Sequence, residues 1–145
     1  MTDTPRHSVS VAAAIFDARG ENVLLIKRRD NGNWEPPGGV LELDESIHEG
    51  LRREVREETG AEIEIGALTG VYKNMARGIL ALVFRCTLET APEEFSPEAA
   101  RVAWKPVTGL NELMLEAYAI RLEDARDPRP PKIRSHDGRN LRTNS

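Results

Sequence analysis

The segment Leu51–Ala61 carries an unusual concentration of charge, with the sequence LRREVREETGA. A surface helix stabilised by ion pairs would place opposite charges three or four residues apart. Instead, Arg52 and Arg56 are like charges four residues apart. Glu54 and Glu58 repeat that unfavourable spacing, and glutamates near the end of a helix also oppose its dipole. Most of these charges are therefore poorly arranged for an ordinary solvent-exposed helix.

Three glutamates of this segment would converge on one side of a helix. At about 100° per residue, Leu51 and Val55 mark the buried direction, and Glu54, Glu57 and Glu58 occupy a sector of about 100° beside it. Carboxylates crowded in this way repel one another unless a cation joins them. Oxygen ligands on a rigid helix suit Mg²⁺ or Mn²⁺, with water and substrate phosphates as the other ligands. The spacing favours a metal site over a solvated helix.

The helix that must position these carboxylates has clear signals at both ends. Ser46 and Glu49 have the spacing of a capping box, and Gly60 is a typical left-handed stop. We therefore expect a helix from Ser46 to Thr59. The preceding segment, Asp30–Gly39, is rich in turn-forming residues and is predicted to be a loop.

The rest of the chain predicts strands and one more helix. Residues 8–16 and 22–29 are expected to be adjacent strands joined by a tight turn, because Asp17–Gly20 is a turn signal. A second amphipathic helix is predicted over Leu110–Arg126. Further strands are expected at residues 61–65, 68–74, 79–88 and 101–107, with a loop at 89–98. This order indicates an α/β (α+β) domain with a helix on each side of a sheet.

The chain of 145 residues has the size of one domain, which we place at residues 1–126. Residues 127–145 are basic and contain three prolines, and they are expected to form a tail outside the packed fold. A net charge of −4 argues against a general nucleic-acid binder. No apolar run is long enough to span a membrane, so we expect a cytoplasmic protein.

The metal, if present, is expected to be a hard ion. The single cysteine, Cys86, lies in an apolar run and is interpreted as a small buried hydrophobe. Three scattered histidines do not provide the ligand spacing of a zinc site. Trp104 is expected to lie in the core.

The charged helix is part of a longer motif that resembles the Nudix box, the signature of the Nudix hydrolases. The matching positions are Gly39, Glu45, Arg53-Glu54-Val55, Glu57-Glu58 and Gly60, in the spacing of that box. The preceding Trp34-Glu35-Pro36-Pro37-Gly38-Gly39 is similar to the lead-in of the family. Ala61 departs from the pattern, as does Pro36, where larger aliphatic residues are usual.

The resemblance implies a fold and an activity. Nudix domains are α/β/α sandwiches around a mixed sheet, and they hydrolyse diphosphate linkages of nucleotides with a divalent metal, here expected to be Mg²⁺, with Mn²⁺ possible. Carried over, Glu54, Glu57 and Glu58 would be metal ligands, with the backbone carbonyl of Gly39 a further ligand. Arg53 would orient these carboxylates through its pair with Glu57.

Other roles follow from the same resemblance. Glu45 would brace the start of the helix. The general base is left open between a box glutamate and a loop glutamate, Glu94 or Glu98. Substrate contacts are expected from Arg28, Trp34, Gly38 and Gly39. The loops at residues 75–78 and 89–98 would determine which nucleotide is accepted.

The leading functional hypothesis is a pyrophosphohydrolase that acts on a small nucleotide, either a nucleoside triphosphate or a related nucleoside diphosphate derivative. ADP-ribose and dinucleotide polyphosphates are alternative substrates. Two other classes are a non-catalytic nucleotide sensor and an RNA 5′-end pyrophosphohydrolase, for which the basic tail would supply phosphate contacts. We expect a monomer or a homodimer.

Overall fold

The structure is a computed structural model that describes residues 3–143. Its centre is a mixed five-stranded sheet with the order β4-β1-β6-β5-β8. β1 and β6 are parallel, as are β5 and β8, whereas the β1–β4 and β5–β6 pairs are antiparallel. The strands are β1 (Ser8–Ile15), β4 (Gly38–Val40), β5 (Ile63–Asn74), β6 (Ile79–Leu88) and β8 (Lys132–His136).

A second, antiparallel sheet has the order β3-β2-β7. Its strands are β2 (Asn22–Arg28), β3 (Trp34–Glu35) and β7 (Ala99–Pro106). The tight turn between the first two strands is present, but the expectation that these strands are adjacent in a sheet is wrong, because β1 and β2 belong to different sheets. A single bridge, Phe16 to Val23, connects them. Both edges of β1 are already paired with β4 and β6, so no edge is left for β2.

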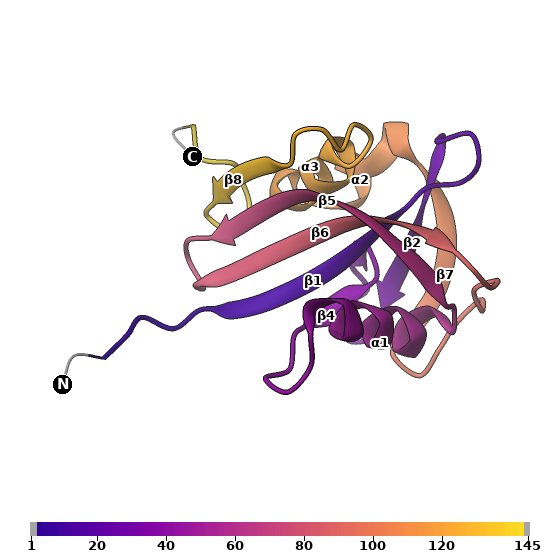
Figure 1. The fold of residues 1–145 in the computed structure, drawn as a ribbon. Helices are drawn as coiled ribbons and strands as arrows, with labels where there is room; N and C mark the ends of the chain where they lie inside the picture. Colours follow the sequence, from indigo (N-terminus) through magenta and orange to yellow (C-terminus); the bar gives the residue numbers. More distant parts are fainter. Residues whose placement is uncertain (1–2, 144–145) are drawn as a thin grey trace.

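Helices cover the sheets from two sides (Figure 1). α1 (Ile47–Thr59) packs through Leu51 and Val55 against one hydrophobic cluster. α2 (Leu110–Leu113) and α3 (Glu116–Asp124) pack against another on the opposite side. This arrangement confirms the predicted α/β/α sandwich. The ends of α1 are also confirmed, since the Ser46 capping box is complete and Gly60 is left-handed, with φ of 76°.

The second predicted helix is not continuous. Residues 107–109 form a 3₁₀ turn, and the helix breaks at Met114, whose backbone is extended with φ of −150° and ψ of 162°. The break turns α3 so that Ala117, Ala119 and Leu122 can be buried against the sheet. Another difference lies at residues 61–74, where one bulged strand, β5, replaces the two strands that we expected.

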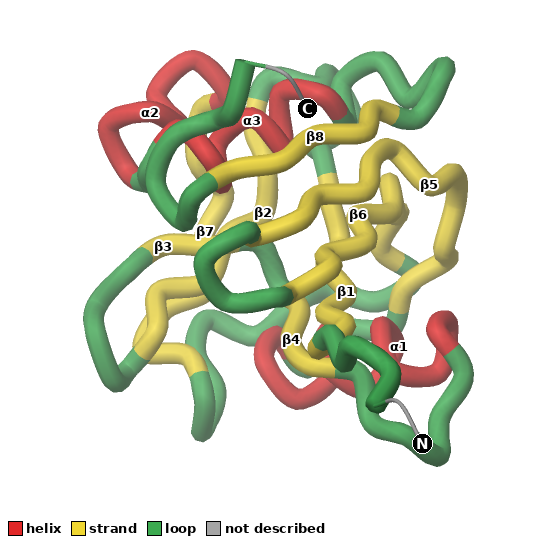
Figure 2. Tube along the Cα trace, turned by 90° about the vertical axis from the view of Figure 1, so that its left-hand side faces the viewer, coloured by secondary structure: helices red, strands yellow, loops and turns green. Residues whose placement is uncertain are grey.

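The predicted tail outside the fold is wrong over residues 132–136. This segment forms β8 and pairs with β5, as Figure 2 shows. His136 is completely buried, and Arg134 forms two hydrogen bonds of 2.8 Å with Asp124 of α3. The reason is that β5 offers an edge that β6 does not cover, and residues 132–136 complete it.

Two single-residue expectations have opposite outcomes. Cys86 is buried, and burial raises the pKa of its thiol to about 12, as expected of a small structural residue. Trp104 does not lie in the core, because its exposed fraction is 39% and it sits on β7 at the edge of the smaller sheet. Within residues 3–143, no helix has the length and apolar character needed to cross a bilayer.

Candidate functional site

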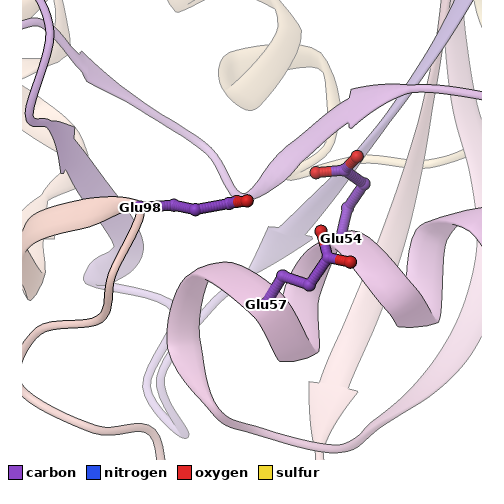
Figure 3. A group of neighbouring side chains, drawn as sticks. All are labelled: Glu54, Glu57 and Glu98. Atoms are coloured by element: carbon purple, nitrogen blue, oxygen red, sulfur yellow. The ribbon is translucent and has the colours of Figure 1, made fainter.

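Three carboxylates from two elements converge beside α1. Glu54 and Glu57 project from the helix, and Glu98 reaches them from the segment that precedes β7 (Figure 3). One oxygen from each lies within 4.8 Å of the others. The exposed position of Glu98 is fixed by Ser96, whose hydroxyl oxygen accepts hydrogen bonds from the backbone N–H groups of residues 98 and 99.

Arg53 ties this cluster to the start of the helix. Its guanidinium donates to both oxygens of Glu45, at 2.9 and 2.7 Å. It also donates to Glu54 at 2.9 Å and to Glu57 at 3.2 Å. The Arg53 hydrogen bonds hold the pKa of Glu45 down at about 2. One cation therefore aligns carboxylates that would otherwise repel one another.

Glu58 has a different environment from its neighbours. Its exposed fraction is 7%, and it accepts a hydrogen bond of 2.7 Å from the backbone N–H of Gly38. Burial, opposed by this hydrogen bond and reinforced by the charges of Glu54 and Glu98, raises its pKa to about 8. The structure thus brings Glu54 and Glu57 together with Glu98, and it places Glu58 next to this group against β4.

Strand β4 approaches α1 so closely that side chains are not tolerated on it. A Cβ atom at Gly39 would lie 2.5 Å from the carboxyl carbon of Glu54, and one at Gly38 would overlap the carbonyl oxygen of Val11. Gly39 is opposite Val11 in the pairing of β4 with β1. These two glycines therefore allow the backbone of β4 to lie directly against the acidic cluster.

The cluster offers only oxygen atoms as metal ligands. These carboxylates are partly desolvated, and there are too few positive charges nearby to neutralise their negative charge. Burial is the main factor that raises the pKa of Glu54, and the charges of Glu57 and Glu98 add to the increase. Hard divalent cations such as Mg²⁺ prefer carboxylate oxygens. The residues therefore fit a divalent metal, which would relieve the repulsion among them.

An open cleft of about 1450 Å³ extends from the cluster. Arg28, Trp34, Gly38 and Gly39, from which substrate contacts are expected, are among the residues that line it. Arg28 is already paired with Asp30, at 2.6 Å. The ring of Trp34 packs against the core and lies 4.4 Å from the ammonium nitrogen of Lys105, so it is also a structural anchor for its loop.

A family model of the NUDIX domain matches residues 6–125. The chain belongs to the Nudix family. Its sequence is 53% identical, over 140 residues, to a MutT-like protein of Streptomyces ambofaciens, covering 97% of this chain and 90% of that protein. It is also 33% identical to the human 8-oxo-dGDP phosphatase NUDT18, covering 88% of this chain but 35% of that longer protein.

Solved structures agree with this assignment. A MutT protein from Methanosarcina mazei is 29% identical, with a TM-score of 0.70 over 88% of this chain and 99% of that chain. A NUDIX hydrolase from Nitrosomonas europaea, 23% identical, shares the fold with a TM-score of 0.77 over 92% of this chain and 82% of that one. This Nudix protein is accordingly a hydrolase of the pyrophosphatase type.

Parts of the Nudix cleft were not predicted from the sequence. Tyr118 and Arg121 of α3 and residues 137–139 after β8 line it. The last of these was missed because residues 127–145 were expected to lie outside the fold. Of the two loop glutamates, Glu98 joins the acidic cluster. The observed contact of Glu94 is made by its backbone, whose carbonyl accepts a hydrogen bond of 2.8 Å from the N–H of Val102.

Proposed function

We propose that this Nudix protein is a Mg²⁺-dependent pyrophosphohydrolase that cleaves the diphosphate linkage of a nucleoside triphosphate or a related nucleoside diphosphate derivative. The observation that carries the proposal is the convergence of Glu54, Glu57 and Glu98 within 4.8 Å at one end of an open cleft. A diphosphate is bound through metal more readily than through carboxylates alone, because like charges repel.

Glu54, Glu57 and Glu58 are the proposed metal ligands, with the carbonyl of Gly39 beside them. A bound divalent ion would polarise the phosphate oxygens and acidify a water molecule. Glu58 begins with a pKa of about 8, and a nearby cation favours its ionised form, so it would join the ligands as the ion binds. Arg53 serves the group by holding Glu54 and Glu57 in place.

Glu98 is the proposed general base. It comes from a loop rather than from α1, it is exposed to water, and it lies beside the carboxylates that would hold the metal. A base must be within hydrogen-bond reach of the water that attacks phosphorus, and only a group adjacent to the metal satisfies this condition. Glu98 would accept the proton of that water as the water oxygen attacks phosphorus and the phosphate leaving group departs.

Arg28, Trp34 and the backbone of Gly38 and Gly39 are proposed to contact the substrate. The guanidinium of Arg28 is half exposed at the cleft, and its pairing with Asp30 is a surface ion pair of the kind that contributes little to stability. A phosphate oxygen could therefore replace Asp30 at low cost. Trp34 offers one flat apolar surface along the cleft.

The proposed substrate class rests on relatives whose names state a substrate. The human 8-oxo-dGDP phosphatase, which is 33% identical over 88% of this chain, supports a nucleotide with a terminal phosphate group. An ADP-ribose pyrophosphatase of Methanocaldococcus jannaschii matches 46% of this chain, which keeps ADP-ribose as the alternative. The case for RNA 5′ ends is weaker than the sequence suggested, because Arg134 of the expected basic tail is occupied by Asp124.

The test is hydrolysis of a panel of nucleoside triphosphates, nucleoside diphosphates, ADP-ribose and a 5′-triphosphorylated RNA, with Mg²⁺ and with EDTA. We expect Mg²⁺-dependent turnover of free nucleotides, and loss of at least about 100-fold in Glu57→Gln. Glu49→Gln is the matched control on the same helix, because glutamine retains the capping box. Tight nucleotide binding without turnover would instead identify a non-catalytic sensor.

A further inference from the structure

Arg121 is a partly buried cation that lines the cleft, and one of its nitrogen atoms lacks the acceptor that such a group requires. Its Nε atom is fully enclosed and has no hydrogen-bond partner. No salt bridge within the described residues includes it, and burial lowers its pKa. A guanidinium that is desolvated without an acceptor is costly, and the arrangement is retained only if something compensates for it.

The carboxylates around Arg121 have other partners. Glu35, whose charge acts on Arg121, forms its ion pair with Arg28 at 3.6 Å. Asp124 accepts hydrogen bonds from the hydroxyl of Tyr72 at 2.8 Å and from Arg134 at 2.8 Å. Arg121 instead lies over two aromatic rings, with its guanidinium carbon 5.2 Å from the ring centre of Tyr72 and 4.9 Å from that of Tyr118. Ring faces stabilise the positive charge but accept no in-plane hydrogen bonds.

The remaining polar neighbour, His136, does not satisfy Arg121 either. Its Nδ1 accepts a hydrogen bond of 3.0 Å from the backbone N–H of Gly138. A neutral imidazole with an accepting Nδ1 carries its proton on Nε2. Nε2 is the atom that faces Arg121, at 3.1 Å from Nη2. With this tautomer, two donors face each other, and Arg121 has a second N–H group that needs an acceptor.

The surroundings of Arg121 indicate what kind of acceptor would fit. The same cleft is lined by Tyr118 and by the apolar residues Leu113, Met114 and Leu115 from the break between α2 and α3. An aromatic and aliphatic wall suits a flat heterocycle, whereas a phosphate would lose hydration there without enough donors. A donor-only group beside such a wall recognises a ring carbonyl.

We propose that Arg121 is a specificity residue that donates a hydrogen bond to the oxo group of the substrate nucleobase and so selects 6-oxopurines over adenine. This inference rests on the proposed nucleotide hydrolysis and adds the identity of the base. Guanine and hypoxanthine present a carbonyl at position 6, whereas adenine presents an amino group that would face the guanidinium donor to donor. A site built to pair with one group discriminates strongly against the analogue that lacks it.

A purely structural role is the competing explanation, because Arg121 also links α3 to the end of β8. The two roles are separable with ITP and ATP, which differ at the six-membered ring edge and carry the same ribose and triphosphate. Loss of a structural contact would affect both nucleotides equally. Loss of a base contact would affect ITP alone.

The experiment compares kcat and KM for ITP and ATP in wild type, Arg121→Met and Arg121→Lys. For wild type we expect kcat/KM to be at least about 10-fold higher with ITP. Arg121→Met should reduce this ratio to roughly 3 or less through a higher KM for ITP, with the ATP values nearly unchanged. Arg121→Lys, which keeps one donor, should retain part of the ratio. Arg126→Met is the control, since Arg126 is exposed at the end of α3.

A ratio that is near one in wild type, or unchanged in Arg121→Met, would overturn the inference while leaving nucleotide hydrolysis intact. If Arg121→Met does not fold, the wild-type protein provides the decision by ¹⁵N NMR of arginine Nε–H groups. The Arg121 resonance should shift with IMP and not with AMP, without any turnover. Equal shifts with IMP and AMP would refute base recognition. If the shift is specific to IMP but the protein hydrolyses no nucleotide, only the hydrolase proposal is refuted.

Discussion

Arg53 and Glu45 form a two-point contact, with Nε 2.9 Å from Oε2 and Nη2 2.7 Å from Oε1. This geometry fixes the plane of the guanidinium, since both partners are flat and matched. The remaining nitrogen, Nη1, is thereby directed at Glu54 and Glu57. The orientation of two proposed metal ligands is thus determined through Glu45, a residue that precedes α1.

Arg53→Lys should weaken the site although it preserves charge. A lysine ammonium cannot span Glu45 and the two helix carboxylates at once. We expect a loss of about 10–100-fold in Mg²⁺ affinity or in kcat/KM, the usual effect of removing a group that orients metal ligands. The measurement is activity against Mg²⁺ concentration. Arg52→Lys on the same helix is the control, and equal losses in both variants would contradict the assignment.

Glu98→Gln should show whether Glu98 acts as the general base or as a metal ligand. If Glu98 accepts the proton of water, kcat should fall about 100-fold or more, with the apparent Mg²⁺ affinity changed by less than about threefold. Glu94→Gln, in the same loop, should retain activity. A variant of Glu98 that recovers full activity at high Mg²⁺ would show that the residue acts as a ligand instead.

Glu58 should make the metal-free protein less stable as the pH rises. Its pKa is about 8 in the folded state, against an ordinary value of 4.5. Between pH 4.5 and 8 the folded state therefore retains a proton that the unfolded state releases, so raising the pH favours unfolding. In EDTA, the free energy of unfolding should fall by about one to a few kcal/mol across this window.

Two comparisons check the direction of this pH dependence of stability. Glu58→Gln should flatten the pH dependence, because glutamine does not titrate. Mg²⁺ should flatten it too, because a bound cation favours the ionised carboxylate in the folded state. Denaturant unfolding at pH 5.5 and pH 8 gives the answer, and a metal-free wild type that gains stability over this range would exclude the assigned shift.

Asp124→Ala should destabilise the protein without acting on the metal site. Asp124 is 6% exposed, and its loss would leave Tyr72 and Arg134 without their acceptor. We expect a cost of about 2–4 kcal/mol, reduced from the fully buried case because Arg134 is a third exposed. The melting temperature should fall by roughly 5–15 °C. Glu123→Ala, which removes an exposed pair, should change it little.

Features encoded by adjacent residues were predictable from the sequence. The helix that carries the box glutamates was predicted within one residue, because Ser46 and Gly60 act through local hydrogen bonds and backbone conformation. The convergence of Glu54 and Glu57 followed from helical periodicity. The pairing of Arg53 with Glu57 was also predicted, and in the structure Nη1 of Arg53 lies 3.2 Å from Oε2 of Glu57.

Features that depend on distant partners were not predictable in this way. The break at Met114 has no glycine or proline to signal it, and it is favoured only because α3 packs against the sheet. β8 is formed by a proline-flanked segment whose partner, β5, lies about 60 residues earlier. The choice of Glu98 over Glu94 depends on a turn around Ser96. Each of these is a tertiary preference that overrides the local sequence.

The pairing of β8 with β5 has a consequence for synthesis on the ribosome. β5 and β6 can pair as soon as residue 88 has emerged, but the outer edge of β5 stays open until residues 132–136 follow. An uncovered strand edge is a site at which nascent chains associate with one another. β8 therefore protects the outer edge of β5. Chains whose synthesis stops before residue 132, or that are cleaved before it, should be the most prone to aggregation.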